Sequence, residues 1–465
     1  MIRLCTTFLA GILISTTHSY AQNQITFTDH VVHIVHRNCA PCHHKGGIGP
    51  FPLITYQDVA KRADFIQQVT QTRYMPPWKA DPTFQRYKNE RLLKPHEINL
   101  IKVWVENGAP EGTPRNMPSP PEFKNNPHLD MEPDMVLTMQ RPYEISDTGI
   151  EDFRFFSVPT NLKEDVYLKA IEFEPGNRRY VHHSRIMVDT TNQIRGIDQM
   201  SEYDPRIKEF QKTPLADEFL YGWVPGNLPI VFPEGTGKPL KKNSDLVFNV
   251  HYAPSGVKDT DQSTVKLYFT KKPVWREVKT FALRENDIVN QPFVIPANGV
   301  KTFYLRSAPL SNEIQLISVL PHMHTLGKSF TAYAITPSGE TIPLVRINDW
   351  DFNWQSTYVF REPLTLPERS IIYDEGIYDN TSNNPENPNV PPRIVTYGWN
   401  TTDEMMNLIM YPLKLVRISQ QLIPWEYYLN LQPQMPVLEP WPLHYATSPK
   451  NQTMELWQMQ LGKRI

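Results

Sequence analysis

The chain has 465 residues, and its 47 Lys and Arg residues almost balance its 49 Asp and Glu residues. Because no basic stripe stands out either, nucleic acid and anionic membrane surfaces are poor candidates as partners. The length suits two or three domains, and 44 prolines against 20 glycines favour many short strands and fixed turns over long helices.

Residues 1–21 have the pattern of a secretory signal peptide. Arg3 precedes the apolar run Leu4–Ile14, and the small-residue pattern Ser19-Tyr20-Ala21 follows it. Neither this run nor any later one reaches the roughly 18 apolar residues expected of a membrane-spanning helix. We therefore expect an exported, periplasmic protein without a membrane anchor.

The cysteines do not provide a disulfide framework. Cys5 falls inside the predicted signal peptide, before most of the apolar run, which is too early for a lipoprotein anchor. Cleavage after Ala21 leaves only Cys39 and Cys42 in a large exported chain. The domains must therefore be stabilised by burial of apolar surface alone.

Residues 22–112 are predicted to form a small helical domain. The segments Tyr56–Ile66 and Lys94–Val105 carry the clearest helical patterns, and Gly108 follows the second segment as a stop signal. Residues 113–134 are rich in Pro, Asn and charged residues without periodicity, so we expect a linker there.

From residue 135 onward the sequence predicts all-β sandwiches. Short β-branched and aromatic runs are bounded by Pro, Asn, Asp and Gly. These runs are Asp165–Phe173, Val181–Val188, Leu246–Tyr252, Thr264–Phe269, Ile314–Leu320 and Leu408–Leu415. The stretch is too long for one sandwich, so we expect two domains, 135–275 and 276–465, joined near Lys271–Glu277, with a long irregular loop at Asp374–Pro392.

The motif Cys39-Ala40-Pro41-Cys42-His43 is the C-x-x-C-H pattern of covalent c-type haem attachment. The two thiols at this spacing can add to the two vinyl groups of one porphyrin, and His43 can ligate the iron from the proximal face. The alternative is a redox pair or half of a zinc site, but the chain has no second cysteine pair to complete such a zinc site.

The second iron ligand is predicted on a loop of the same domain. Met75 precedes Pro76 and Pro77, which fix the backbone, and His/Met ligation favours electron transfer. A buried core methionine is the alternative role for Met75, and His96 is the competing ligand. Residues 27–112 resemble a class I cytochrome c.

Five of the six histidines beyond the linker fall in three compact motifs, which are Tyr180-Val181-His182-His183-Ser184, Asn249-Val250-His251-Tyr252 and Pro321-His322-Met323-His324. His322 and His324 are two apart and share one face of a strand, so they can bind one ion. His182 and His183 are adjacent, so binding one ion together requires a bulge or a strand end. Singly, each is more often a structural histidine; together they favour a metal site.

The nature of the metal follows from a further ligand. Met405 follows a polar turn at Thr401–Glu404 and precedes the apolar run Leu408–Tyr411. A thioether suits Cu(I), whereas non-haem iron and hard ions call for carboxylates. Taken alone, Met405 is more often a core residue.

The order of these motifs resembles the copper type II, ascorbate-dependent monooxygenases, such as the peptidylglycine α-hydroxylating and dopamine β-monooxygenases. The match covers roughly residues 135–430. The resemblance implies two jelly-roll-like domains with one copper each. It places an electron-transfer copper at His182, His183 and His251, and an oxygen-binding copper at His322, His324 and Met405.

The family reaction inserts one atom of O₂ into a C–H bond, reduces the other atom to water and consumes two electrons. We therefore expect a small-molecule substrate and an electron donor, with the covalent haem supplying the copper. Leu320 stands where the peptide enzymes carry a carboxylate-binding arginine, which disfavours a glycine-terminated peptide. Asn407 matches a substrate-pocket asparagine. The alternatives are a non-catalytic electron-transfer protein and an oxidase that reduces O₂ without hydroxylating anything.

Overall fold

A computed structural model describes residues 24–415, apart from residues 46, 48, 89, 123–128, 130, 203, 208–218, 226, 228 and 399. The predicted signal peptide with Cys5, and the end of the predicted C-terminal domain at 416–465, lie outside the described residues. None of the described helices has the length and apolarity that a membrane crossing requires, since α4 has 12 residues.

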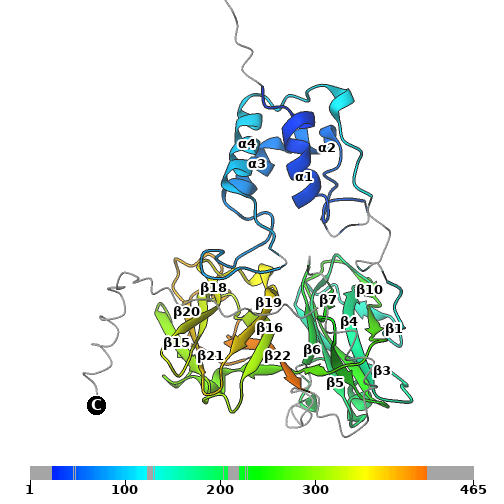
Figure 1. Cartoon of the computed structure of the whole chain (residues 1–465), viewed down its shortest axis with the longest axis vertical. Coiled ribbons are helices and arrows are strands. Elements are labelled where there is room, and N and C mark those ends of the chain that lie inside the picture. The colour runs from blue at the N-terminus through cyan, green and yellow to red at the C-terminus, as the bar shows by residue number, and fades with distance from the viewer. Residues whose placement is uncertain are drawn as a thin grey trace, which may run out of the picture. The chain divides into compact units, whose positions relative to one another are not determined.

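Four α-helices precede the strands (Figure 1). They are α1 (Val32–Asn38), α2 (Tyr56–Ala60), α3 (Ala63–Gln71) and α4 (Pro95–Glu106), with a π-helical turn at Phe27–Val31 and a 3-10 turn at Pro114–Asn116. They enclose a core that includes Phe27, Ile66 and Trp104. The α4 helix matches its predicted span and stops before Gly108, whose φ of 82° a residue with a Cβ rarely adopts.

The single helix predicted at Tyr56–Ile66 is wrong as a continuous element. The backbone of Arg62 leaves the helical region, with φ −124° and ψ 16°, and separates α2 from α3. Its guanidinium lies 4.1 Å from the centre of the Phe51 ring and donates a hydrogen bond to the carbonyl of Asp58. Tertiary packing of one long side chain thus overrides a local helical pattern.

The remaining described residues form β-sheets, which confirms the predicted β-sandwich architecture at that level. The first half contains β1 (Met135–Thr138), β2 (Tyr143–Ile145), β3 (Asp152–Pro159), β4 (Val166–Glu174), β5 (Val181–Asp189), β6 (Phe219–Trp223), β7 (Ile230–Val231), β8 (Thr236–Leu240), β9 (Asp245–Tyr252), β10 (Asp259–Asp261) and β11 (Thr264–Phe269), with a 3-10 turn η3 (Gln193–Ile197).

The second half contains β12 (Arg276–Val278), β13 (Phe281–Leu283), β14 (Val294–Ile295), β15 (Val300–Arg306), β16 (Ile314–His322), β17 (Gly327–Ile335), β18 (Thr341–Ile347), β19 (Tyr358–Leu366), β20 (Ile371–Asp379), β21 (Val395–Thr396) and β22 (Asn407–Leu415), with 3-10 turns η5 (Glu285–Asp287) and η6 (Phe352–Trp354). All six runs predicted as strands coincide with observed strands to within about two residues at each end.

The first sandwich packs the sheet β3-β9-β5-β6 against β1-β11-β4-β8. Phe173 of β4 meets Phe248 of β9 and Trp223 of β6 at ring-centre distances of 6.2 and 5.2 Å. Every residue of β9 is buried, because one face lies in this core and the other is covered by further residues, among them Phe155 and Ile194. Five of the eight residues of β9 are apolar or aromatic besides the buried Asp245, Asn249 and His251, as suits a strand covered on both faces.

The second sandwich packs the sheet β15-β20-β17-β18 against β22-β16-β19. Its core includes Phe303, Leu316, Tyr378 and Met410. The two sandwiches share one ten-stranded sheet, because β12 pairs in parallel with β8 and antiparallel with β22. The predicted loop at Asp374–Pro392 begins too early, because Asp374–Asp379 continues β20 with strictly alternating burial.

The segment between α3 and α4 crosses into the second sandwich. Trp78, Ala80 and Tyr87 belong to the buried core of that sandwich. The Tyr87 hydroxyl donates a hydrogen bond to the carbonyl of Leu344 at 2.7 Å, and Trp78 packs edge-on to Tyr358 with ring centres 5.1 Å apart. Residues predicted to serve the helical domain therefore also stabilise the β region.

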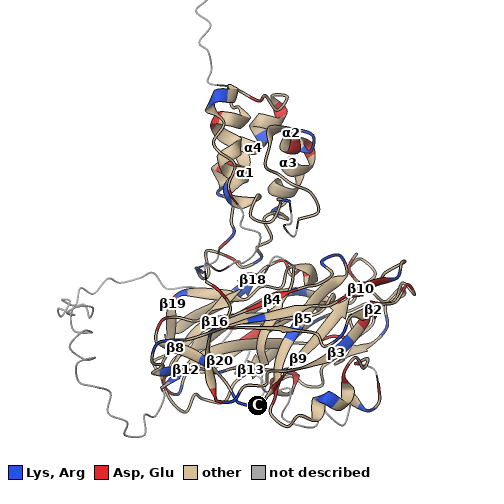
Figure 2. Ribbon diagram, turned by 90° about the vertical axis from the view of Figure 1, so that its right-hand side faces the viewer, with Lys and Arg blue, Asp and Glu red and all other residues tan. Residues whose placement is uncertain are grey.

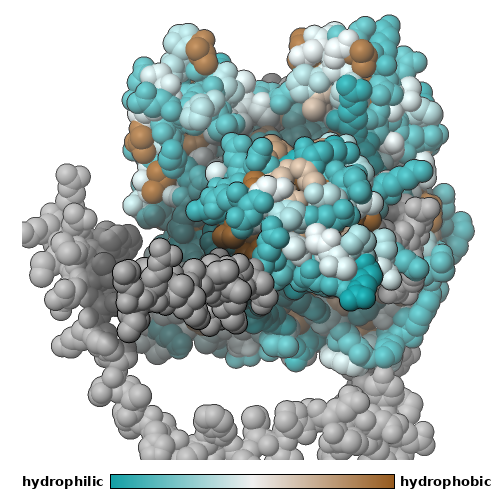
Figure 3. Space-filling view, turned by 90° about the horizontal axis from the view of Figure 1, so that it is seen from above, coloured by the Kyte–Doolittle hydropathy of each residue, from teal (hydrophilic) through white to brown (hydrophobic). Residues whose placement is uncertain are grey.

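The surface of the described residues carries both signs of charge. In Figure 2, Lys and Arg residues alternate with Asp and Glu residues over the strands, without a continuous basic stripe in that view. Figure 3 shows the apolar side chains of another face as separate patches on a mostly hydrophilic surface. Neither view shows a broad apolar or basic face.

Candidate functional site

His182, His183 and His251 form a triangle of ring nitrogens. The three Nδ1–Nδ1 distances are 3.3, 3.4 and 3.3 Å. A point equidistant from three atoms at this spacing lies about 1.9 Å from each of them, close to the roughly 2.0 Å of a metal–imidazole bond. Among the described residues, this trio is the one group of three His, Cys, Asp or Glu side chains with metal-binding geometry.

The triangle cannot be explained by hydrogen bonds among the rings. In a neutral imidazole, Nδ1 carries either a proton or a lone pair. Of three such atoms at least two are in the same state, so at least one of the three close contacts is repulsive. A cation at the centre, facing three lone pairs, removes this repulsion, so the geometry fits a bound metal ion.

The adjacent histidines meet through a β-bulge. In the pairing of β5 with β9, Val181 lies opposite Tyr252 and His183 opposite His251, so the register shifts and His182 is the extra residue. The sequence predicted that His182 and His183 could bind one ion together only at a bulge or a strand end, and β5 contains such a bulge. A bulge re-aims one side chain without ending the strand.

Burial keeps the rings of His182 and His183 neutral. Desolvation lowers the pKa of His182 to about 4, with a smaller contribution from the neighbouring His251. Desolvation and the nearby histidines also hold the pKa of His183 well below its usual value. Neutral imidazoles have the lone pairs that a metal requires.

Aromatic and acidic groups surround the trio. The Phe153 ring stacks on His251 with ring centres 3.9 Å apart and an interplanar angle of 5°. The Nε2 atom of His251 lies 3.5 Å from a carboxylate oxygen of Glu151. Glu151 also accepts a 2.6 Å hydrogen bond from Thr401. A carboxylate behind the outer ring nitrogen favours a proton on Nε2 and so leaves Nδ1 free to bind a metal.

His322 and His324 form a second pair at the end of β16. Their ring centres are 5.1 Å apart. The Nδ1 atom of His322 is 2.5 Å from the side-chain oxygen of Gln355, and Nδ1 of His324 is 3.1 Å from the carbonyl oxygen of Asp403. Both oxygens can only accept hydrogen bonds, so each ring donates from Nδ1–H and presents an unprotonated Nε2 as a ligand atom.

Met405 is joined to this pair by a buried carboxylate. Glu404 has no exposed surface and accepts backbone N–H bonds from His324 at 2.8 Å, Leu326 at 2.7 Å and Met405 at 3.1 Å. Burial raises the pKa of Glu404 to about 8, although these bonds oppose the increase. No local pattern singles out Glu404, because its role depends on three backbone N–H groups that only the folded chain brings together.

Residues of both groups line one cavity of about 850 Å³. His183 reaches it from the first sandwich, and His322 and Met405 reach it from the second. Its wall is mostly apolar and includes Phe155, Val247 and Ile409. The volume and the apolar lining are typical of a small-molecule site.

The polar groups of the cavity include Asn407, which the sequence singled out, and Arg185, which it did not. Arg185 lies two residues after His183 on the same face of β5, and strand alternation could have identified it. Its guanidinium bonds to Glu202 and to Asn249 at 3.1 and 2.8 Å. Asn407 lines the cavity and donates a 3.0 Å hydrogen bond to Glu285.

The Cys39–His43 motif continues the turn after α1. The amide of His43 donates to the carbonyl of Cys39 at 2.9 Å, and both thiols are free. Burial is the main reason why the pKa of Cys39 is raised to about 12 and that of Cys42 is raised. The His43 Nδ1 lies 3.0 Å from the carbonyl oxygen of Phe51, so Nε2 is again the ring nitrogen without a proton. This arrangement fits the attachment of a haem.

The candidates for the second iron ligand differ in exposure. Met75 is half-buried in the loop after α3, where its amide donates to the carbonyl of Val69. His96 is exposed in the first turn of α4. Exposure disfavours His96, because an axial ligand lies under the porphyrin.

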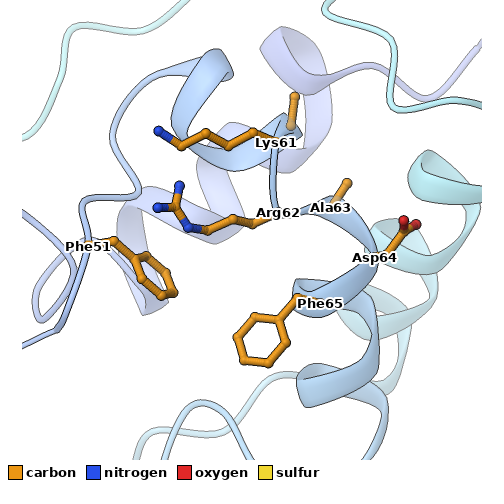
Figure 4. Close-up of a pocket in the computed structure, with 7 residues that line it drawn as sticks. Phe51, Lys61, Arg62, Ala63, Asp64 and Phe65 are labelled. Carbon is orange, nitrogen blue, oxygen red and sulfur yellow. The ribbon is translucent and has the colours of Figure 1, made fainter.

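A second hollow, of about 310 Å³, lies between Phe51 and the α2–α3 junction. Figure 4 shows Arg62 extending toward the Phe51 ring, with Phe65 on the next helix. Phe51 lines this hollow, and its backbone carbonyl is the group that lies 3.0 Å from Nδ1 of His43. It holds no cluster of metal-binding groups among the described residues.

Comparisons with known proteins do not assign the chain to a family. No protein-family profile matches it, and no curated protein matches it. Among solved structures, the major capsid protein P2 of bacteriophage PM2 has a TM-score of 0.24 at 6% identity, over 61% of this chain and 98% of the capsid protein. A two-domain protein of unknown function from Bacteroides fragilis has a TM-score of 0.16 at 12% identity, over 59% and 94%. At such scores these likenesses carry no argument about function.

Proposed function

We propose that the protein is an exported, periplasmic copper-dependent monooxygenase that receives electrons through a covalently attached c-type haem. One observation carries the proposal. Three imidazole nitrogens face one another in the trio of His182, His183 and His251, and one member of that trio, His183, lines the same cavity as His322 and Met405. A nitrogen-only site and a site with a soft thioether, facing one substrate-sized space, suit two coppers with different tasks.

The residues divide the work between the two groups. His182, His183 and His251 would hold the electron-transfer copper, while His322, His324 and Met405 would hold the copper that meets O₂. Bound copper supplies one-electron redox chemistry and, where a coordination position stays open, a place for O₂. Such a reaction would insert one atom of O₂ into a substrate C–H bond and reduce the other to water with two electrons and two protons, and two one-electron copper sites would supply one electron each.

The chain itself orients ligands and controls access. Gln355 and the Asp403 carbonyl fix the tautomers of His322 and His324, so that both present Nε2. Phe352 lies between the groups, with its ring centre 5.7 Å from those of both His182 and His324. The apolar wall of the cavity would bind the body of a small organic substrate, and Asn407 and Arg185 would bind its polar groups.

Labelled O₂ provides the test. Holoprotein loaded with copper and supplied with a reductant should transfer label from ¹⁸O₂ into the product of a suitable substrate from a screen. Met405→Ala should abolish product formation and leave the haem spectrum unchanged. Reduction of O₂ to peroxide or water without labelled product would instead indicate an oxidase. Fast haem reduction by a partner, with no O₂ consumption, would indicate an electron carrier.

A further inference from the structure

The η6 turn and the residue after it touch three parts of the molecule. The Phe352 ring lies against His182, His183 and His324, with ring-centre distances of 5.7, 6.4 and 5.7 Å. Gln355 binds His322. At the same turn, the Trp354 ring meets Tyr74 edge-on, with ring centres 5.7 Å apart and an interplanar angle of 72°.

Tyr74 directly precedes Met75, the candidate iron ligand. The contact between Tyr74 and Trp354 therefore joins the loop that would face the haem to the turn that faces the histidine trio. A path from Met75 to His182 that follows the chain and these contacts contains two steps between residues that are not covalently linked. One step is from Tyr74 to Trp354, and the other is from Phe352 to His182.

The two loops are held together by other contacts. Lys79, four residues after Met75, forms ion pairs with Asp349 at 2.9 Å and Asp351 at 3.6 Å. Lys79 and Asp351 are only 13% and 18% exposed, so this pair is partly shielded from solvent, whereas Asp349 is 88% exposed and its pair with Lys79 is screened. Trp78 is anchored in the core of the second sandwich against Tyr358. The aromatic contact thus lies on a fixed junction.

We infer that Tyr74, Trp354 and Phe352 form the route by which an electron passes from the haem at Cys39 and Cys42 to the copper at the histidine trio. The inference rests on the proposed function. The step moves one electron: haem iron goes from ferrous to ferric, copper goes from cupric to cuprous, and no bond or proton changes place. Packed aromatic rings shorten the gaps that an electron must cross outside covalent bonds.

Flash photoreduction of the haem tests this route. Holoprotein containing ferric haem and Cu(II), kept without O₂, receives one electron at the haem from a photoexcited donor. The haem absorbance band then decays as the electron moves to Cu(II), at a rate independent of protein concentration. Trp354→Leu should slow this decay roughly tenfold. Copper content, haem spectrum and haem potential should equal those of the wild type.

Two further variants separate the route from a general structural effect. Trp354→Phe keeps an aromatic ring and loses no hydrogen bond, since the indole N–H has no partner among the described residues. It should transfer electrons at nearly the wild-type rate. Tyr373→Leu removes a ring that stacks on Tyr333 in the other sheet of the second sandwich, and it should leave the rate unchanged.

An unchanged rate in Trp354→Leu would overturn the route. So would a wild-type haem that passes no electron to bound Cu(II). The second result would also remove the haem as the electron source of the proposed function, but the hydroxylase activity itself would stand if the same preparation still hydroxylates a substrate with ascorbate as reductant. Normal electron transfer without any labelled product would instead overturn the hydroxylase proposal and leave the route intact.

Discussion

Glu404 provides a quantitative test of how the ligand loops are held. Its carboxylate accepts three backbone N–H bonds, from His324, Leu326 and Met405, at 2.7 to 3.1 Å. Both oxygens are used, Oε1 by Leu326 and Oε2 by the other two. One buried side chain therefore fixes the spacing of two candidate metal ligands.

Glu404→Gln replaces one accepting oxygen with an NH₂ group that cannot accept. At least one of the three backbone N–H groups is then buried without a partner, at a cost of about 1–3 kcal/mol in unfolding free energy. Glu404→Ala removes both acceptor oxygens and with them all three hydrogen bonds, and at about 1–2 kcal/mol per bond the loss of unfolding free energy is about 3–6 kcal/mol. Urea unfolding of the metal-free protein, followed by tryptophan fluorescence, measures both losses.

Comparing the unfolding free energies of Glu404→Ala, Glu404→Gln and the wild type tests whether the three hydrogen bonds cause the losses. If Glu404→Ala is no less stable than Glu404→Gln, or if both lie within about 0.5 kcal/mol of the wild type, the three-bond account is wrong. The alanine variant should also lose copper from the His322 and Met405 site before it loses copper from the histidine trio, because the trio makes no bond to Glu404 among the described residues.

The other predictions concern titration, ligand support and the junction. Burial raises the folded-state pKa of Glu404 to about 8, above the unfolded-state value of about 4.3. The stability that this difference contributes is complete below about pH 4.3 and is lost as the pH rises through 8. Unfolding midpoints measured from pH 5 to 9 should therefore fall in the wild type relative to Glu404→Gln. His183→Ala should lose one of two bound coppers, as measured by metal analysis after dialysis. Gln355→Leu should weaken copper binding at His322 by roughly 10- to 100-fold in a competition titration. Tyr87→Phe should cost about 1 kcal/mol in unfolding free energy, and a change below about 0.3 kcal/mol would contradict the importance of that buried hydrogen bond.

Much of the β region could be predicted because its signals are local. Short β-branched and aromatic runs identified the strands, and the neighbours His182 and His183 required a bulge or a strand end, of which β5 contains the bulge. Register is set by such patterns wherever one face of a sheet is buried. The grouping of His251 with His182 and His183 came from the resemblance to the copper monooxygenases, because the register that pairs β5 with β9 was not predicted from the sequence.

The errors arose where distant segments decide the structure. The burial of Trp78 and Tyr87 in the second sandwich depends on strands more than 250 residues further along the chain. The break at Arg62 depends on its packing over Phe51. No local pattern carries this information, because tertiary packing overrides propensity.

The contacts of η6 could not be predicted from the sequence for the same reason. Phe352 and Trp354 lie in a short turn between two strands, without a motif. Their importance follows from what they touch. Arg185 was different, because its position two residues after His183 on a strand was already a signal that it faces the same space.

The central claim is that this chain holds two coppers with different ligands. X-ray absorption of the fully reduced, copper-loaded protein tests it most directly, combined with metal analysis of the same sample. Two coppers per chain, with nitrogen ligands overall and a copper–sulfur signal that Met405→Ala removes, is the predicted result. A single copper per chain, or a wild-type spectrum without sulfur, would contradict it.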